Sequence, residues 1–183
     1  DGGGGGGGGG GDHIIDLPEE VSTVGTGANM EYDTTTLRFG YQSLVSPRSD
    51  YDYDLVARTL RLVKRDAVLG GYDPEQYETH RLWAIAPDGA RIPISIVHRR
   101  GMNLNGTSPA VLYGYGAYEA SIDPTFSFAR VSLLERGFVF AIAHIRGGGE
   151  LGRHWYNDGK LGHKANTFTD FIACAEHLVA QGY

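Results

Sequence analysis

The stretch FVFAIAHI, residues 138–145, decides the fold class. Seven of its eight residues are apolar, and the run has the length of a strand, not of a helix. A continuous apolar run of this length predicts a strand buried on both faces and flanked by two neighbouring strands. The glycine-rich segment RGGGELG follows at 146–152, as expected of a turn at the end of such a strand.

The clearest helical pattern comes next, in NTFTDFIACAEHLVAQG at 166–182. Apolar residues recur there at intervals of three and four, which predicts one apolar helix face. The residues of this face are Phe168, Phe171, Ile172, Ala175, Leu178 and Val179. Thr167 and Asp170 have the spacing of a capping box, and Gly182 stands where a glycine ends a helix.

Upstream of the decisive strand, HRLWAIA at 80–86 and RIPISIVHR at 91–99 flank the turn signal Pro87-Asp88-Gly89, which predicts a hairpin. A short strand is expected at 110–113 and a helix at 128–136. The resulting order is strand, strand, strand, helix, strand, helix. An α/β-hydrolase begins in this way, and its next strand ends in the turn that carries the nucleophile. No G-x-S-x-G occurs in the 183 residues. We therefore expect that next strand to lie beyond the chain and to be one of the two neighbours of the 138–145 strand.

The N-terminal part reads differently. The run Gly2–Gly11 predicts flexible coil or an artefact and is set apart from the fold. Short β-like segments follow, TTTLRFGYQSLVSP at 34–47, YDYDLVART at 51–59 and LRLVKRD at 60–66, as in a propeller blade. GGYDPEQYE at 70–78 marks the boundary. We therefore expect a tail at 1–11, a β-sheet domain at 12–72 and an α/β domain at 73–183.

Composition limits the function. The net charge is −6 with no basic stripe, so neither nucleic acid nor an anionic membrane is an expected partner. No apolar run approaches the length of a membrane helix. The one cysteine, Cys174, excludes an intrachain disulfide, which favours the cytoplasm. Because the sequence begins with Asp1, an export signal upstream stays open.

Three segments carry a family resemblance: LYGYGAY at 112–118, AIAHIRGGGELG at 141–152 and WYNDGKLGHKANTFTDF at 155–171. Together they resemble the prolyl oligopeptidase family of serine peptidases, and within it the oligopeptidase B branch. Residues 16–47 and 51–60 are similar to the last propeller segment of that branch. The resemblance covers residues 13–183. It implies the end of a β-propeller followed by the N-terminal half of an α/β-hydrolase sheet, truncated before the nucleophile strand.

The resemblance also implies site residues and partners. Tyr115 matches the family's oxyanion-hole side chain, Tyr118 an aromatic near the primary pocket, and Asp123 an acid that receives a basic residue next to the cleaved one. Thr125 stands where a second acid is expected. The implied substrates are short peptides cut after Arg or Lys, with no cofactor and no metal. The Ser, His and Asp of the catalytic triad lie outside the chain, which we therefore expect to be inactive by itself and to need the rest of its catalytic domain and propeller.

Two alternatives remain. Gly147, Gly149 and Gly152 satisfy G-x-G-x-x-G after an apolar strand, with Asp170 about 20 residues on, as in a dinucleotide-binding module. The chain could otherwise be an inert structural fragment. His144, His154 and His163 lack the spacing of metal ligands on one element, and Cys174 reads as a buried inert thiol.

Overall fold

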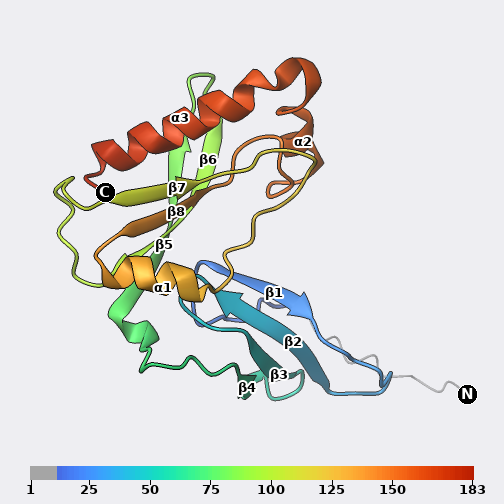
Figure 1. Cartoon of the computed structure of the whole chain (residues 1–183). Helices are drawn as coiled ribbons and strands as arrows, with labels where there is room; N and C mark the ends of the chain where they lie inside the picture. Colours follow the sequence, from blue (N-terminus) through green and yellow to red (C-terminus); the bar gives the residue numbers. More distant parts are fainter. Residues whose placement is uncertain (1–11) are drawn as a thin grey trace, which may run out of the picture.

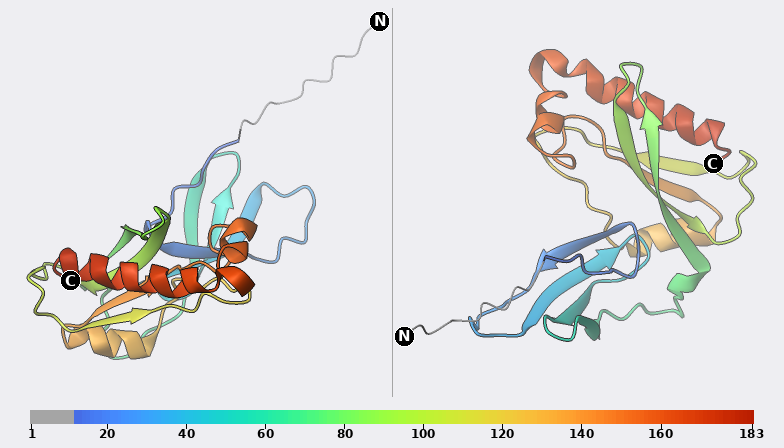
Figure 2. Two further views of the ribbon diagram at one scale, coloured as in Figure 1. Left: turned by 90° about the horizontal axis from the view of Figure 1, so that it is seen from above. Right: turned by 180° about the vertical axis from the view of Figure 1, so that it is seen from behind.

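The computed structural model describes residues 12–183, which form two four-stranded sheets and three α-helices (Figure 1). The segment 1–11, for which the sequence predicts flexible coil or an artefact, lies outside the described residues. The three α-helices all lie in the part of the chain that forms the second sheet, and the first sheet lies beside the second (Figure 2). No helix in the described range is long and apolar enough to cross a membrane.

The first sheet is an antiparallel meander whose strands follow one another in chain order. Its strands are β1 Ser22–Thr26, β2 Thr36–Ser43, β3 Ser49–Asp54 and β4 Thr59–Arg65. Four buried aromatic rings, Phe39, Tyr41, Tyr51 and Tyr53, form its core. They alternate along β2 and β3, so one face of the sheet is aromatic, as the period of two requires.

Charged side chains occupy the opposite face of the first sheet and bond to one another there. Asp52 accepts hydrogen bonds from Arg38 at 2.6 Å and from Arg61 at 2.8 Å. The bond from Arg38 is the main cause that lowers the pKa of Asp52. The strand predicted over 51–59 is wrong in its second half: β3 ends at Asp54, because the Asp54 carboxylate accepts from the amides of Val56 and Ala57 and starts a turn.

The second sheet has the strand order β5-β6-β8-β7. Its strands are β5 Tyr77–Ile85, β6 Arg91–Arg99, β7 Ala110–Tyr113 and β8 Val139–Ala143. The hairpin predicted around Pro87-Asp88-Gly89 is confirmed as the antiparallel pair β5 and β6. β7 runs parallel to β8, and helix α1, Phe128–Glu135, makes the crossover between them. The predicted order of strands and helices over 80–183 is therefore confirmed.

The strand β8 has both of its neighbours within the chain. It pairs with β6 on one side and with β7 on the other. The expectation that one neighbour of the 138–145 run would be a strand beyond the chain is wrong, because β7 crosses over to take that place. The two edge strands of this sheet are β5 and β7.

Two helices cover the sheet from opposite faces. α3, Ala165–Ala180, packs against β5 and β6, while α1 packs against β8 and β6 on the other face (Figure 1). The core on the α3 side is built from the apolar residues of β5, β6 and β8 together with Trp155, Cys174 and Leu178. The smaller elements are α2 Arg153–Asn157 and the 3₁₀ turns Pro74–Gln76 and Leu161–His163.

A further apolar cluster joins the two sheets. Val21, which precedes β1, and Leu44 and Val45, which follow β2, pack with four buried residues of the second sheet and its helix α1. These four are Tyr77, Val97, Leu134 and Ile142. The Tyr72 hydroxyl from the linker donates to the Val45 carbonyl at 2.5 Å. The first sheet is therefore attached to the second through a shared core on the α1 side.

The capping box predicted at Thr167 and Asp170 is wrong. The 3₁₀ turn at 161–163 runs directly into α3, so the helix begins at Ala165 and both residues lie inside it. The Thr167 hydroxyl donates to the Arg146 carbonyl at 2.7 Å, and Asp170 binds the Arg146 guanidinium. At the other end, Gly182 has φ +80°, and its amide donates to the Val179 carbonyl, so the predicted glycine stop is confirmed.

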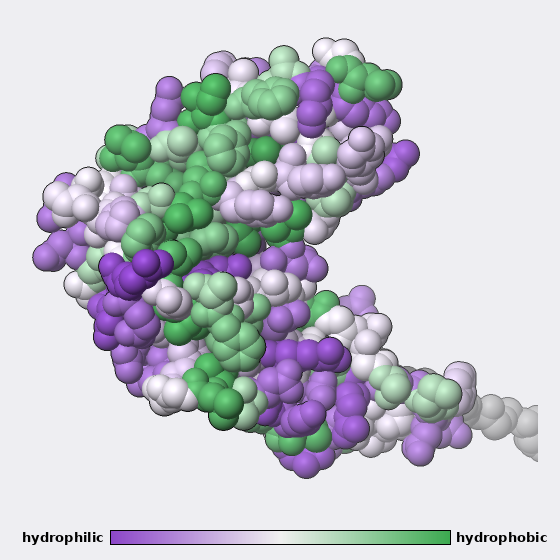
Figure 3. Space-filling view, in the orientation of Figure 1, coloured by the Kyte–Doolittle hydropathy of each residue, from purple (hydrophilic) through white to green (hydrophobic). Residues whose placement is uncertain are grey.

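Half of the six predicted apolar positions of α3 are exposed, and of the six only Leu178 is buried. Cys174 and Leu178 face the sheet, whereas Phe168, Ile172 and Val179 are 63%, 55% and 75% exposed. Apolar atoms gather over α3 and the neighbouring β7 edge in Figure 3. An apolar helix stripe beside an unpaired strand edge is a surface that folded proteins ordinarily cover.

Candidate active site

The segment after β7 is held against α3 by glycines. A Cβ added at Gly114 would lie 2.9 Å from the Phe171 ring, and one at Gly116 would lie 2.5 Å from Thr167 Cγ2. Gly116 also has φ +62°, a conformation that other residues rarely adopt. The Lys164 ammonium and the Thr167 hydroxyl both contact the Gly116 carbonyl. Glycine is required here because the backbone itself touches the helix.

This close approach leaves the tyrosine side chains on the outside. Tyr115, the predicted oxyanion-hole residue, is 46% exposed at the carboxyl end of β7. Tyr118 is 84% exposed and has φ +56°. An exposed phenol can donate a hydrogen bond to a molecule that lies over the end of the sheet. The backbone contacts with α3 fix the position of the loop and therefore of this donor.

The glycine-rich segment 146–152 packs against the same loop. Gly147 touches the Gly116 carbonyl and has φ +99°, and its own carbonyl accepts from the Glu119 amide at 3.1 Å. The Gly147 amide donates to the Trp155 carbonyl, and the Trp155 indole donates to the His144 carbonyl at 3.0 Å. The glycines therefore serve backbone-to-backbone packing between this loop and the segment that carries Tyr115.

Arg146 anchors this packing below the surface. Its guanidinium donates to the fully buried Asp170 at 2.6 and 2.9 Å and to Asp88 of the hairpin turn at 2.6 Å. The hydrogen bond to Asp170 is the main cause that raises the pKa of Arg146, and the bond from Arg146 lowers the pKa of Asp88. One buried cation thus ties β8, α3 and the hairpin together.

A buried chain of three polar groups lies beside it. The Ser95 hydroxyl and His144 Nε2 are 2.6 Å apart, and His144 Nδ1 is 3.6 Å from Glu150 Oε1. Burial favours a raised pKa for Glu150, but the neighbouring His144 ring and the hydrogen bond from the Ile122 amide outweigh it and lower the pKa. The order serine, histidine, acid matches a catalytic triad, yet Ser95 is wholly buried, so a peptide carbonyl cannot reach its hydroxyl. This group holds the 119–122 segment through the Ile122 amide.

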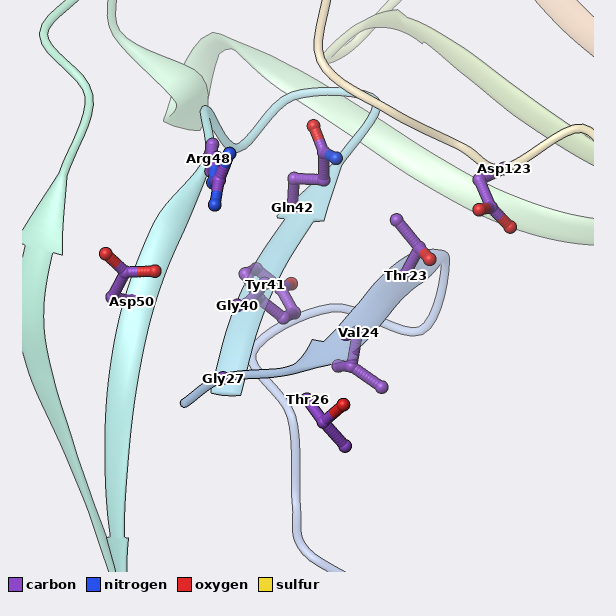
Figure 4. Close-up of a pocket in the computed structure, with 11 residues that line it drawn as sticks. Thr23, Val24, Thr26, Gly27, Gly40, Tyr41, Gln42, Arg48, Asp50 and Asp123 are labelled. Atoms are coloured by element: carbon purple, nitrogen blue, oxygen red, sulfur yellow. The ribbon is translucent and has the colours of Figure 1, made fainter. Parts of the chain in front are cut away.

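Asp123 lies at the junction of the two sheets. Its carboxylate lines a hollow formed mainly by β1 and β2, including Thr23, Tyr41 and Arg48. Figure 4 shows Asp123 on the loop that passes the start of β1, across from Thr23. Asp123 also lines a second hollow, with Arg81, Trp83, His144 and Glu150. Figure 3 shows the molecule hollowed between its upper and lower parts, on the side where this loop runs.

The two hollows at the sheet junction do not bring the three predicted site residues together. Asp123 lines both hollows at the sheet junction, whereas Tyr115 and Tyr118 line neither of them. All three belong to a single segment, 114–125, that the glycines and Glu150 hold in place. Thr125 follows Asp123 in a turn, with its amide donating to the Asp123 carbonyl at 2.8 Å.

The dinucleotide alternative is not favoured. Oxygens of the chain itself surround the glycines of 146–152: the Gly116 carbonyl at Gly147, the Glu150 carboxylate at Gly148 and the Glu119 carbonyl at Gly149. These acceptors would repel a pyrophosphate instead of donating to it. Asp170, the acid that this alternative needs for a ribose, is bonded to Arg146.

Sequence reasoning missed two groups of polar residues. Ser95, His144 and Glu150 lie on separate elements, and no spacing along the chain announces their contact. Glu78, His80 and His98 also come together in the described part of the chain, with potential metal-ligand atoms within 4.8 Å of one another. A sequence signal did exist for the second group. In an antiparallel hairpin centred on Asp88, position 78 lies opposite position 98, so Glu78 and His98 could have been expected to be cross-strand neighbours.

Comparison with known proteins shows which peptidases the chain is similar to. The model of the prolyl oligopeptidase family matches residues 124–183. A dipeptidyl aminopeptidase BI from Pseudoxanthomonas mexicana is 46% identical over 166 residues, 90% of this chain and 23% of the relative. Protease 2 from Moraxella lacunata is 41% identical over 92% of this chain and 24% of its own length. The chain thus spans about a quarter of the length of these relatives.

Solved structures agree with this assignment. Oligopeptidase B from Trypanosoma brucei, with covalently bound antipain in a closed form, matches with a TM-score of 0.80 and 42% identity. The match covers 92% of this chain and 24% of that structure. A prolyl endopeptidase, one of two studied for inter-domain dynamics, matches with a TM-score of 0.81 and 32% identity, over 92% of this chain and 24% of its own.

Proposed function

The chain belongs to the prolyl oligopeptidase family, and from that premise we propose that it is part of a serine peptidase that cleaves short peptides after Arg or Lys. The observation that supports this most strongly is the exposed Tyr115 phenol on a loop whose backbone is fixed by Gly114 and Gly116. In an α/β-hydrolase, one oxyanion donor comes from the loop after this strand. A fixed donor aimed at the developing negative charge lowers the barrier to acyl transfer.

The proposal assigns each of the other two residues a part in binding. Asp123 offers a carboxylate at the sheet junction, where it can attract a basic side chain next to the cleaved residue. Tyr118 offers an exposed ring near the primary pocket. The similarity to an oligopeptidase B with bound antipain and to Protease 2 supports a choice of short peptides.

In the same proposal the two sheets are parts of larger domains. β1–β4 would be the end of a β-propeller, and the second sheet the first half of an α/β-hydrolase sheet. The free β7 edge would pair with the strand that ends in the nucleophile, and the exposed stripe of α3 would lie under the following elements. The serine, histidine and aspartate of the triad would come from that part. In the same proposal the protein is cytoplasmic, because the one cysteine of the chain, Cys174, is free, as is usual for cytoplasmic proteins.

A second candidate is the release of dipeptides from a free N-terminus. The 46% identity to a dipeptidyl aminopeptidase BI favours it. The two activities differ in one requirement, since only dipeptide release needs the α-amino group of the substrate.

The test compares blocked and unblocked fluorogenic peptides that place Arg, Lys, Pro or Ala at the cleaved bond, using a longer protein that contains this chain. We expect cleavage after Arg and Lys in blocked peptides, abolished by a serine-directed phosphonate. Cleavage only with a free N-terminus would favour dipeptide release, and cleavage after Pro alone would contradict the specificity. The 183-residue chain should give no turnover with any of these peptides.

A further inference from the structure

The start of the β5–β6 hairpin brings together three side chains that the proposed function does not use. Glu78 and His80 are two residues apart on β5 and therefore point to the same face of the strand. His98 on β6 pairs directly with Glu78. The strand register thus places one carboxylate and two imidazoles on a single patch of the sheet.

The distances within this patch are close to those of a metal site. One ligand atom from each of the three residues lies within 4.8 Å of the other two, and Glu78 Oε2 is 3.9 Å from His80 Nε2. Tetrahedral zinc with bonds of about 2.1 Å holds its ligand atoms about 3.4 Å apart. A cation could therefore be bound after side-chain rotations that bring the three ligand atoms from within 4.8 Å to about 3.4 Å of one another.

The burial of His98 supplies an independent observation. Its side chain is 4% exposed, and its Nε2 has no hydrogen-bond partner among the described residues. Its Nδ1 is 3.0 Å from the Arg99 carbonyl, a contact of the kind that orients metal-binding imidazoles. A buried polar nitrogen without a partner costs free energy, and coordination of a cation by this ring would offset that cost.

The types of donor define the cation. Two imidazoles and one carboxylate suit zinc and related transition metals, whereas calcium and magnesium favour sites made of oxygens. The neighbouring cation is Arg100, whose Nη1 is 3.7 Å from Glu78 Oε2. Its side chain is 62% exposed and also bonds to the Glu75 and Tyr77 carbonyls, so it can leave the carboxylate without being buried elsewhere.

We propose that Glu78, His80 and His98 bind a divalent transition metal, with zinc as the expected ion, and that the metal ties the first residues of β5 to the end of β6. His80 is 44% exposed, so the site can be reached from solvent and a water molecule can complete the coordination. This hairpin follows the linker from the first sheet, and a bound metal would stabilise the point at which the two sheets are connected.

The test is zinc titration of the 183-residue chain by calorimetry, together with Co²⁺ substitution monitored by visible absorption. We expect one equivalent to bind, with the intense absorption of a tetrahedral nitrogen and oxygen site. Glu78→Gln and His80→Ala should each weaken zinc binding at least tenfold. The control is His163→Ala, which removes an exposed histidine outside the site and should leave the affinity unchanged.

His98→Ala is avoided as the main variant because it would leave a cavity in the fold. The same variants placed in a longer protein that contains the chain give a second measurement: zinc should raise the unfolding temperature of the parent and of His163→Ala, but not of Glu78→Gln. Absence of binding at about 100 µM zinc, or equal affinity in the parent and in both site variants, would overturn the proposal.

Discussion

At the scale of single residues, the candidate site depends on glycines that carry no chemistry themselves. Gly116 and Gly147 both adopt positive φ, and the carbonyl of the first touches the second. A side chain at either position would separate the loop that carries Tyr115 from the one that carries Glu150. The sequence predicted a glycine-rich turn at 146–152 and contains glycines at 114 and 116, but the contact between the two segments depends on the fold and could not be read from spacing.

Tyr115→Phe, made in an active protein that contains this chain, should lower kcat about 10²- to 10³-fold while KM changes little. The lost phenol O–H matters chiefly in the transition state, where the carbonyl oxygen gains charge. Steady-state kinetics with a blocked Arg peptide measures this. Tyr118→Phe is the matched control and should keep kcat within a few-fold. An unchanged kcat in Tyr115→Phe, with chemistry shown to be rate-limiting, contradicts the assigned role.

Asp123→Asn should instead raise KM, and only for peptides with a basic residue beside the cleaved one. The carboxylate attracts that side chain in the ground state and in the transition state alike, so kcat should stay close to its original value. Because the hollows that Asp123 lines are open to solvent, high salt should reduce the difference between the parent and the variant. Peptides that lack the extra basic residue serve as the control. An equal effect on both peptide sets would show that Asp123 has a structural role.

At the scale of elements, α3 shows what periodicity can and cannot predict. Its six predicted apolar positions, with Cys174, span an arc of about 160° at 100° per residue. The sequence identifies this arc but does not say which part faces the sheet. In the structure, Cys174 and Leu178 are buried while Ile172 and Val179 are exposed. The sheet ends at β7, so part of the apolar arc of α3 has no strand to pack against and stays exposed.

The exposed half of that arc should make the isolated chain associate with itself. Ile172→Lys and Val179→Lys should shift the chain from aggregates toward monomer at tens of micromolar, because each places a charge on the apolar stripe. Light scattering coupled to gel filtration measures this. Val56→Lys, at a 77% exposed position in the turn after β3, is the matched control and should change nothing. A parent chain that is already monomeric and unfolds sharply would contradict the idea.

The positions of the strands along the chain were easier to predict than the order in which the strands pair in the sheet. The hairpin, the short strand at 110–113 and the buried run of β8 all follow from local pattern. The position of β8 between β6 and β7 does not, because a crossover through α1 reorders strands without any local signal. The capping-box prediction was wrong for a related reason. Thr167 and Asp170 have the spacing of caps, but both bond to Arg146, which lies 24 residues before Asp170: the Thr167 hydroxyl donates to the Arg146 carbonyl, and Asp170 accepts from the Arg146 amide.

At the scale of the whole molecule, one shared apolar cluster connects the two sheets. Leu44 is 1% exposed and belongs to the same cluster as Leu134 of α1. The linker between β4 and β5 adds the Tyr72 hydrogen bond to the Val45 carbonyl. The relative position of the sheets therefore rests on few buried side chains, and the hollows beside Asp123 depend on it.

Leu44→Ala should lower the free energy of unfolding by about 2–5 kcal/mol and separate the unfolding of the first sheet from that of the second. The reason is that the lost methyl groups leave a cavity in the shared cluster. Urea unfolding followed by circular dichroism should then show two transitions. Leu178→Ala, in the core under α3, should cost a similar amount without separating them. A single transition in both variants would mean that other contacts couple the sheets.

The indole of Trp155 gives this architecture an optical signal of its own. Trp155 is 5% exposed and bonded to the His144 carbonyl, whereas the only other tryptophan, Trp83, is 38% exposed. Emission from a dry indole lies at shorter wavelength than emission from a hydrated one. Undocking of the glycine loop would therefore be visible as a red shift without any attached dye, and replacing Trp83 by Phe would leave a protein with a single tryptophan that reports on that loop alone.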